Sequence, residues 1–185
     1  MVSQLNNRAT WATLSRILAT PVLIGLISVR ANWSDWTAIV LFMAAAFTDY
    51  LDGYYARRDG LVSNFGKFMD PVADKVLVSG ILVSLMWLGR IDQWILFLIL
   101  TRDTIIGGIR SIAAADHIVI DAKPTGKWKT AIQMGAIPFL MIPDQPQLQQ
   151  AGYVVMWFSV LLSLSSGFEY VKYYLTHSNA RPSAK

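Results

Sequence analysis

The segment "DYLDGYYARRDGLVSNFGKFMDPVAD", which runs from Asp49 to Asp74, places four aspartates in a chain that is otherwise rich in apolar residues. Asp49 and Asp52 are three residues apart, and Asp70 and Asp74 are four apart. On an α-helix, residues at these spacings share a face. Gly60 lies between the two pairs and favours a helix stop. We therefore expect two consecutive antiparallel helices that bring four carboxylates together at one end of a polar cleft.

The flanks of this segment have the composition of a membrane protein. The sequence has 185 residues, of which 54% are hydrophobic and 15% charged, whereas soluble domains carry about 25% charged residues. Apolar runs recur at residues 11–29, 36–47, 76–89, 93–101, 130–143 and 151–167. A membrane span needs roughly 20 residues, so these runs with their flanks predict about six transmembrane helices. A soluble chain of this length could not cover six such helices, and the predicted fold class is an all-α integral membrane protein.

A polar segment, "MVSQLNNRATWATLSR", precedes the first long apolar run. It has no small-residue cleavage pattern, so we predict a short interfacial N-terminal helix, not a signal peptide. No linker or repeat suggests a second domain. We expect one membrane domain over residues 1–177 and a flexible polar tail over 178–185. The sequence contains no cysteine, which excludes disulfides and thiolate metal sites.

The basic residues are distributed unevenly between the two ends of the predicted helices. If the amino terminus is cytoplasmic and the helices alternate, most lysines and arginines fall on the cytoplasmic side, and the other side receives Arg30 and Arg90. This asymmetry is typical of integral membrane proteins and places residues 49–74 at the cytoplasmic face. It also argues against nucleic acid as a partner, despite the net charge of +4.

Four carboxylates in one place require a source of positive charge. Two like charges ~4 Å apart repel by about 4 kcal/mol at an effective dielectric constant of ~20. Divalent cations relieve this repulsion best, and ligands that offer oxygen without His or Cys favour magnesium, manganese or calcium over zinc. Two acidic pairs at the ends of neighbouring spans favour a metal site, because acids in a membrane are costly and usually functional. The alternative is a set of solvated acids balanced by nearby cations, namely Arg57, Arg58, Lys67 and Lys75.

Small residues lie on the same predicted helix faces as the aspartates. Gly53 and Ala56 lie on the face of Asp49 and Asp52 at helical spacing, and Gly66 lies one turn before Asp70. Such residues would let a ligand approach the backbone closely, but close helix packing uses the same residue types. The residues alone leave both interpretations open.

The spacing D-x2-D-G-x2-A-R-x8-G-x3-D-x3-D, from Asp49 to Asp74, resembles the signature of the CDP-alcohol phosphatidyltransferases. The resemblance extends along most of the chain. "LSRIL", "GKFMDPVADKVLV" and "TGKWKTAIQM" are similar to the phosphatidylglycerophosphate synthase branch, as is the segment from Arg102 to Arg110. One departure is Asp103, where that branch commonly has Glu after the arginine.

The resemblance implies a homodimer of six-helix subunits in the bacterial inner membrane, with the active site open to the cytoplasm. It implies two divalent ions, Mg²⁺ or Mn²⁺, one held by Asp49, Asp52 and Asp70 and the other by Asp49, Asp70 and Asp74. Asp74 also matches the proposed general base. The positions that match the binding site of CDP-diacylglycerol are Asp49, Gly53, Ala56, Arg57, Ser63 and Gly66.

The reaction expected from the resemblance is phosphatidyl transfer from CDP-diacylglycerol to sn-glycerol 3-phosphate, which yields phosphatidylglycerol phosphate and CMP. The acceptor phosphate is an anion and needs cations of its own. We predict that Arg110, Lys127 and Lys129 supply them, because they lie towards the cytoplasmic ends of the fourth and fifth spans. Arg102 and Asp103 fall deep in the fourth span, and the sequence does not reveal their role.

Two alternative functions stay open. The same chemistry could use another acceptor, either inositol phosphate or phosphatidylglycerol, the latter giving cardiolipin. A small ion or phosphate transporter could also place acids and bases among six helices, although its site would be expected near the bilayer midplane. A soluble nucleotide-binding module is disfavoured, because the chain has no glycine-rich loop of the P-loop or Rossmann kind.

Overall fold

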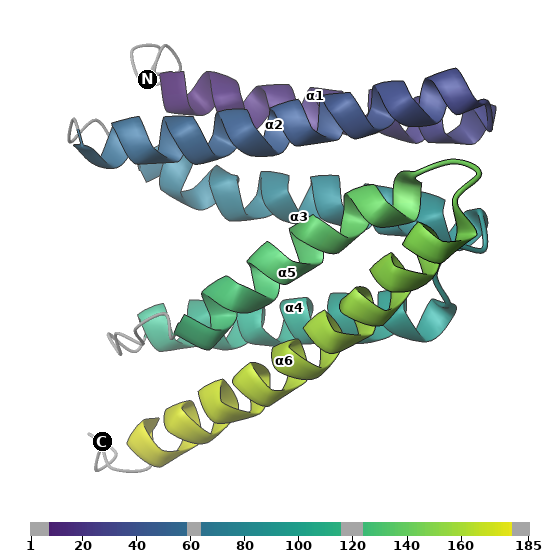
Figure 1. Cartoon of the computed structure of the whole chain (residues 1–185). Coiled ribbons are helices and arrows are strands. Elements are labelled where there is room, and N and C mark those ends of the chain that lie inside the picture. The colour runs from purple at the N-terminus through teal and green to yellow at the C-terminus, as the bar shows by residue number, and fades with distance from the viewer. Residues whose placement is uncertain (1–7, 59–63, 116–123, 179–185) are drawn as a thin grey trace.

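The computed structural model is a bundle of α-helices and describes residues 8–58, 64–115 and 124–178 (Figure 1). Within these ranges it contains no strand. The helices are α1 (Arg8–Val29), α2 (Asn32–Arg58), α3 (Asn64–Trp87), α4 (Gln93–Ala115), α5 (Pro124–Met141) and α6 (Pro146–Ser178). The all-helical fold with six long helices is therefore confirmed.

The amino-terminal end differs in one respect from the expectation. α1 begins at Arg8 and continues unbroken to Val29, through Pro21. The second half of the predicted interfacial segment thus belongs to the same helix as the first apolar run. Residues 1–7 and the end of the predicted tail, residues 179–185, lie outside the described part.

Successive helices run in opposite directions. Figure 1 shows the α1–α2, α3–α4 and α5–α6 turns at one end of the molecule, which we call the turn end. Left-handed backbone conformations help to close these turns: Gly89 has a φ of 71° after α3, and Asp144 a φ of 55° between α5 and α6. The side chain of Asp92 caps α4, because its Oδ1 accepts a hydrogen bond from Ile95 N at 2.9 Å.

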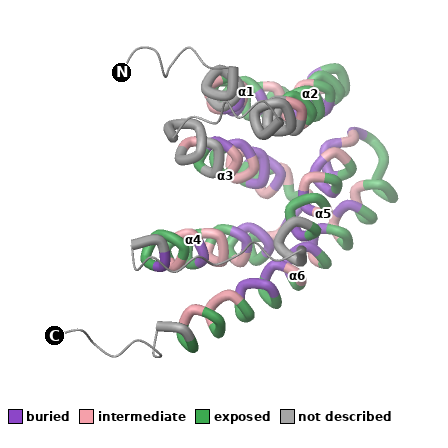
Figure 2. Tube along the Cα trace, turned by 90° about the vertical axis from the view of Figure 1, so that its left-hand side faces the viewer, coloured by how far each residue is buried: buried purple, intermediate pink, exposed green. Residues whose placement is uncertain are grey.

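The helices form two groups. α1 packs against both α2 and α3, and α6 packs against both α4 and α5. Contacts between the groups are fewer and run mainly from α2 to α5 and from α3 to α4. Figure 2 shows the two groups one above the other.

The buried apolar core lies in the half of the bundle nearest the turn end. Its members come from the last turns of α1, α3 and α5 and the first turns of α2, α4 and α6. The largest fully buried side chains include Leu23, Ile27, Phe42, Leu82, Leu85, Ile95, Leu140 and Met156. The polar side chains described below lie beyond the edge of this core.

One helix among the described residues, over Pro146–Thr176 in α6, is long and apolar enough to cross a membrane. The helix over Leu14–Val29 is apolar but shorter. α4 carries three charged residues, Arg102, Asp103 and Arg110, within its 23 residues, and these lower its hydropathy. Six membrane crossings therefore stay a prediction.

Candidate active site

The four aspartates of the signature lie on two consecutive antiparallel helices. Asp49 and Asp52 are in the second half of α2, and Asp70 and Asp74 are in the first half of α3. These are the halves of the two helices away from the turn end (Figure 1). The helix assignment and the antiparallel direction are thus confirmed. The side chains of Asp49, Asp52 and Asp70 lie outside the described part, so the convergence of four carboxylates stays a prediction.

Asp74 is the member of this set whose side chain is described, and it is paired with Arg16 of α1. Arg16 Nη1 donates to Asp74 Oδ1. The Arg16 side chain is 3% exposed and that of Asp74 is 47% exposed. A buried guanidinium therefore holds a carboxylate that water or a substrate can still reach.

Close packing of α1 against α3 makes this pair possible. A Cβ atom at Gly80 would lie 2.7 Å from Thr20 Cγ2, which is too close for any side chain. Thr20, one turn from Arg16 on α1, donates its hydroxyl to Arg16 O at 2.9 Å. The missing side chain at Gly80 thus lets α1 approach α3 closely. The sequence analysis did not include Arg16 among the site residues, although a lone arginine in an apolar run is itself a functional signal.

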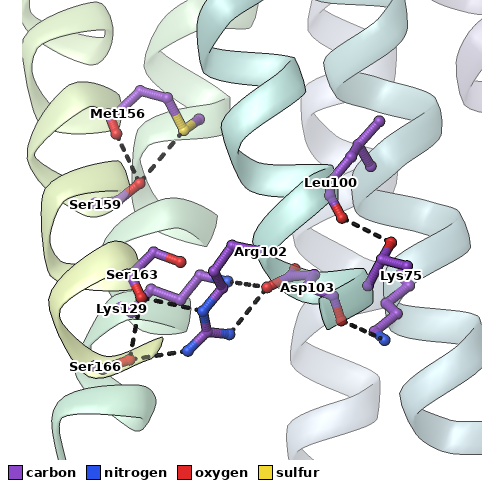
Figure 3. Close-up of polar contacts among 10 residues, drawn as sticks. Lys75, Leu100, Arg102, Asp103, Lys129, Met156, Ser159, Ser163 and Ser166 are labelled. Atoms are coloured by element: carbon purple, nitrogen blue, oxygen red, sulfur yellow. Dashed lines mark hydrogen bonds and ion pairs between the residues drawn. The ribbon is translucent and has the colours of Figure 1, made fainter. Parts of the chain in front are cut away.

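A second polar cluster joins α4, α5 and α6 around Asp103 (Figure 3). Asp103 Oδ1 accepts hydrogen bonds from Arg102 Nη1 at 3.0 Å and from Lys129 Nζ at 2.7 Å. The Lys129 side chain is 5% exposed and that of Asp103 is 25% exposed. Arg102 also reaches α6, where Nε donates to Ser163 O at 3.1 Å and Nη2 to Ser166 Oγ at 2.8 Å.

Asp103 is needed to keep these two cations together. Two unit charges about 5 Å apart repel by about 3 kcal/mol at an effective dielectric constant of about 20. The Arg102 guanidinium and the Lys129 ammonium contact the same carboxylate oxygen, so they are about that close. The role of Arg102 and Asp103, which the sequence left open, is thus at least to connect α4 with α5 and α6.

Lys75 links this cluster to the Asp74 region. Its Nζ donates to the Asp103 carbonyl oxygen at 3.1 Å. A Cβ atom at Gly107 would lie 2.9 Å from the same Nζ, so the glycine leaves room for the lysine. Since Lys75 directly follows Asp74, α3 contributes one residue to the Arg16–Asp74 pair and the next residue to the Asp103 cluster.

The three predicted acceptor-phosphate residues are not brought together by the contacts of the described side chains. Arg110 is exposed and lies over the Tyr170 ring, with Cζ 5.4 Å from the ring centroid. On α4 it lies about 10 Å beyond Asp103 along the helix axis, the rise of two turns. Lys129 is instead buried on Asp103, and the Lys127 side chain lies outside the described part.

The metal site can be judged by the chemistry of its donors. Among the described side chains no three of His, Cys, Asp and Glu cluster, but three of the four expected ligands are outside that set. The fourth, Asp74, offers a half-exposed carboxylate. Its chemistry fits a hard divalent cation, which prefers oxygen ligands. The expected CDP-diacylglycerol positions Gly53, Ala56, Arg57, Ser63 and Gly66 have no described side-chain environment.

Comparison with known proteins identifies the class. A family model described as CDP-alcohol phosphatidyltransferase matches residues 6–165. The chain is 31% identical to a CDP-diacylglycerol–glycerol-3-phosphate 3-phosphatidyltransferase of Rickettsia bellii, over 90% of this chain and 94% of that protein. It is 33% identical to the Bacillus subtilis protein of the same name, over 85% and 90%. It is 34% identical to a probable phosphatidylglycerophosphate synthase of Mycobacterium tuberculosis, over 91% and 82%.

These matches confirm the sequence interpretation at the level of the enzyme class. The protein is a phosphatidyltransferase. The chain belongs to the CDP-alcohol phosphatidyltransferase family.

Proposed function

We propose that this enzyme transfers the phosphatidyl group of CDP-diacylglycerol to the 1-hydroxyl of sn-glycerol 3-phosphate, in phospholipid biosynthesis. The observation that carries the proposal is the similarity along nearly the whole chain to relatives named for this reaction. The signature from Asp49 to Asp74 supports it, because it supplies carboxylates for cations and small residues beside them.

Asp74 is the proposed general base. The acceptor hydroxyl oxygen attacks the phosphatidyl phosphorus, its proton passes to the Asp74 carboxylate, and the bond from phosphorus to the CMP oxygen breaks. CMP leaves with the electron pair of that bond. An alcohol is a weak nucleophile near neutral pH, so a base within reach matters. The half-exposed carboxylate of Asp74 supports this role.

Asp49, Asp52, Asp70 and Asp74 are the proposed ligands of two Mg²⁺ or Mn²⁺ ions. Negative charge on the diphosphate and on the departing CMP would be balanced by these cations. Arg57 would add a planar, permanently charged fork for a phosphate oxygen. Asp49, Gly53, Ala56, Ser63 and Gly66 complete the proposed site for the CDP part of the lipid.

Membrane integration through six helices is part of the proposal. α6 meets the length and composition of a span, and large apolar side chains point outward on other helices too, such as Leu18, Val40 and Phe97, 70%, 66% and 56% exposed. Exposed apolar surface on this scale fits contact with lipid. The distribution of basic residues favours an active site at the cytoplasmic face of the bacterial inner membrane. We further infer a homodimer, as the family resemblance implies.

The acceptor phosphate is proposed to bind cations at the cytoplasmic side of α4 and α5, with Arg110, Lys127 and Lys129 as candidates. The net positive charge of the region around Asp103 supports this, since Arg102 and Lys129 bind its carboxylate and Lys75 binds its carbonyl oxygen.

Labelled CDP-diacylglycerol offered with one acceptor at a time tests the function. We expect CMP release that requires glycerol 3-phosphate and Mg²⁺ and stops when a chelator is added. Release with inositol phosphate or phosphatidylglycerol in place of glycerol 3-phosphate would assign a different acceptor. Transport of solute without cleavage of the lipid would contradict the transferase.

A further inference from the structure

Asp103 lies where three helices meet and is bound through both its side chain and its backbone. Its Oδ1 accepts hydrogen bonds from Lys129 Nζ at 2.7 Å and Arg102 Nη1 at 3.0 Å. Its carbonyl oxygen accepts one from Lys75 Nζ at 3.1 Å. One residue of α4 thus fixes cations that come from α3, α4 and α5.

The two cations on the Asp103 carboxylate differ in what else they bind. Arg102 also donates to Ser163 O and Ser166 Oγ, so its guanidinium is held by α6. Lys129 has a flexible stem and three N–H donors, and the contact with Asp103 needs one of them. The ammonium can therefore bind Asp103 and a second anion at the same time, whereas Arg102 has the contacts of a structural residue.

We propose that Asp103 is a positioning residue of the acceptor site, which holds the Lys129 ammonium at the contact of α4 with α5 so that it binds the acceptor phosphate. This inference rests on the proposed function, in which that phosphate belongs to glycerol 3-phosphate. Arg102 and Lys129 contact the Asp103 carboxylate and Lys75 contacts the Asp103 carbonyl oxygen, so three cations lie around one negative charge. The two positive charges that remain are close to the charge of a phosphate monoester at pH 7.

Removal of the carboxylate has two opposing effects on phosphate binding. Loss of a nearby negative charge strengthens binding of the phosphate anion. Loss of the charged Oδ1 that Arg102 and Lys129 share, however, leaves these two cations to repel each other. Because Arg102 is held by α6, Lys129 is the side chain that moves. We expect this displacement to dominate, since Lys129 is buried and its contact with Asp103 is short.

Steady-state kinetics of the full-length enzyme, with lipid and acceptor varied in turn, provide the test. Asp103→Asn is expected to raise the KM for glycerol 3-phosphate about tenfold, the loss of one charge-assisted hydrogen bond. The KM for CDP-diacylglycerol should stay near the wild-type value. Asp103→Glu, which keeps the charge, should keep both constants. Asp144→Asn is the matched control, because it makes the same chemical change at an exposed site near the turn end.

A double substitution shows whether Asp103 acts through Lys129. Lys129→Gln should raise the same KM, and adding Asp103→Asn should change it no further. The double variant also covers the case in which Asp103→Asn fails to fold, because it removes the stranded lysine charge together with the carboxylate. In that case its KM is compared with that of Lys129→Gln alone.

Several results would overturn the role of Asp103. For Asp103→Asn, these results are equal changes in both KM values or a lower KM for glycerol 3-phosphate. An Asp103→Glu variant with the same KM values as Asp103→Asn would also contradict the role. So would additive effects of Asp103→Asn and Lys129→Gln on the KM for glycerol 3-phosphate. A wild-type enzyme that ignores glycerol 3-phosphate and uses another acceptor would instead overturn the proposed function, so the two failures are distinguishable.

Discussion

Arg16 and Asp74 are 58 residues apart in the sequence, yet the Arg16 guanidinium binds the carboxylate that we propose as the general base. The cation is buried and the acid is half-exposed. Since α1 contributes the cation and α3 the acid, the packing of these two helices sets the position of the carboxylate. Gly80 is part of the same arrangement, because it leaves the space that Thr20 fills.

Substitution of Arg16 should therefore impair catalysis from outside the signature segment. Arg16→Met should lower kcat by up to about 100-fold, because a misplacement of about 1 Å can have that effect. Arg16→Lys keeps a cation, so its kcat should fall less than that of Arg16→Met. The measurement is CMP release at saturating lipid and acceptor, with Arg30→Met, an exposed arginine in the α1–α2 turn, as control. Equal rates for Arg16→Met and wild type would remove Arg16 from this role.

Asp74→Asn tests the base itself. We expect kcat to fall by about 100-fold or more, the usual contribution of a general base, while the nucleotide still binds. Binding of labelled CMP separates the two effects, and a thermal unfolding curve is needed because the substitution removes the negative charge of the Arg16–Asp74 pair. Near-normal turnover in a folded variant would show that another group takes the proton.

Arg110 is a predicted acceptor residue with an exposed side chain, unlike the buried Lys129. Arg110→Gln should raise the KM for glycerol 3-phosphate by about tenfold, the value of one charge-assisted hydrogen bond, and leave the KM for the lipid nearly unchanged. Tyr170→Leu removes the ring beneath the guanidinium and should have a smaller effect of the same kind. Similar changes in both KM values after Arg110→Gln would place this arginine outside the acceptor pocket.

The sequence predicted the helices well because their signal is local. Apolar runs and turn residues are read within one segment, and the apolar run predicted from residue 93 begins where α4 begins, at Gln93. The rotation of each helix depends on its neighbours, so pairs such as Arg16–Asp74 and Lys129–Asp103 could not be predicted from spacing. Charge patterning did indicate the importance of Lys129 but assigned it to substrate alone, without its partner Asp103.

Contacts at the turn end could not be predicted from the sequence either. From the sequence, Arg90 was expected only as one of two basic residues on the outer side. In the structure its Nη2 donates to Asp35 Oδ2 at 2.8 Å, and its Nη1 donates to Leu140 O and Met141 O at 3.2 and 2.8 Å. One arginine thus joins the start of α2 to the end of α5, a contact that hydropathy could not indicate.

Asp92, also at the turn end, gives a prediction for acid conditions. Burial alone would raise the pKa of Asp92, but hydrogen bonds from the Tyr153 hydroxyl and the Ile95 and Trp94 amides outweigh it and hold the pKa below the ordinary value of an aspartate. A lowered folded-state pKa contributes stability above the unfolded value, and this contribution is lost as the pH falls through the folded value. The melting temperature of Asp92→Asn should therefore be below that of wild type at pH 7, and the gap should narrow below about pH 4. A gap that is independent of pH would mean that the charge of Asp92 is not involved.

Arg90→Met should destabilise the protein more than any other single substitution discussed for the turn end. It leaves the Asp35 carboxylate, whose side chain is 5% exposed, without its cation, and it removes the donors from the last carbonyls of α5. The loss of one partner of a buried pair costs about 3–5 kcal/mol. The loss of stability in Arg90→Lys should lie between zero and that of Arg90→Met, because an ammonium keeps the charge but cannot reproduce the two-sided contact of the guanidinium. Unfolding in detergent measures the effect, and the double variant Asp35→Asn/Arg90→Met should lose less than the sum of the single losses. Strict additivity would show that the two side chains stabilise the turn end independently.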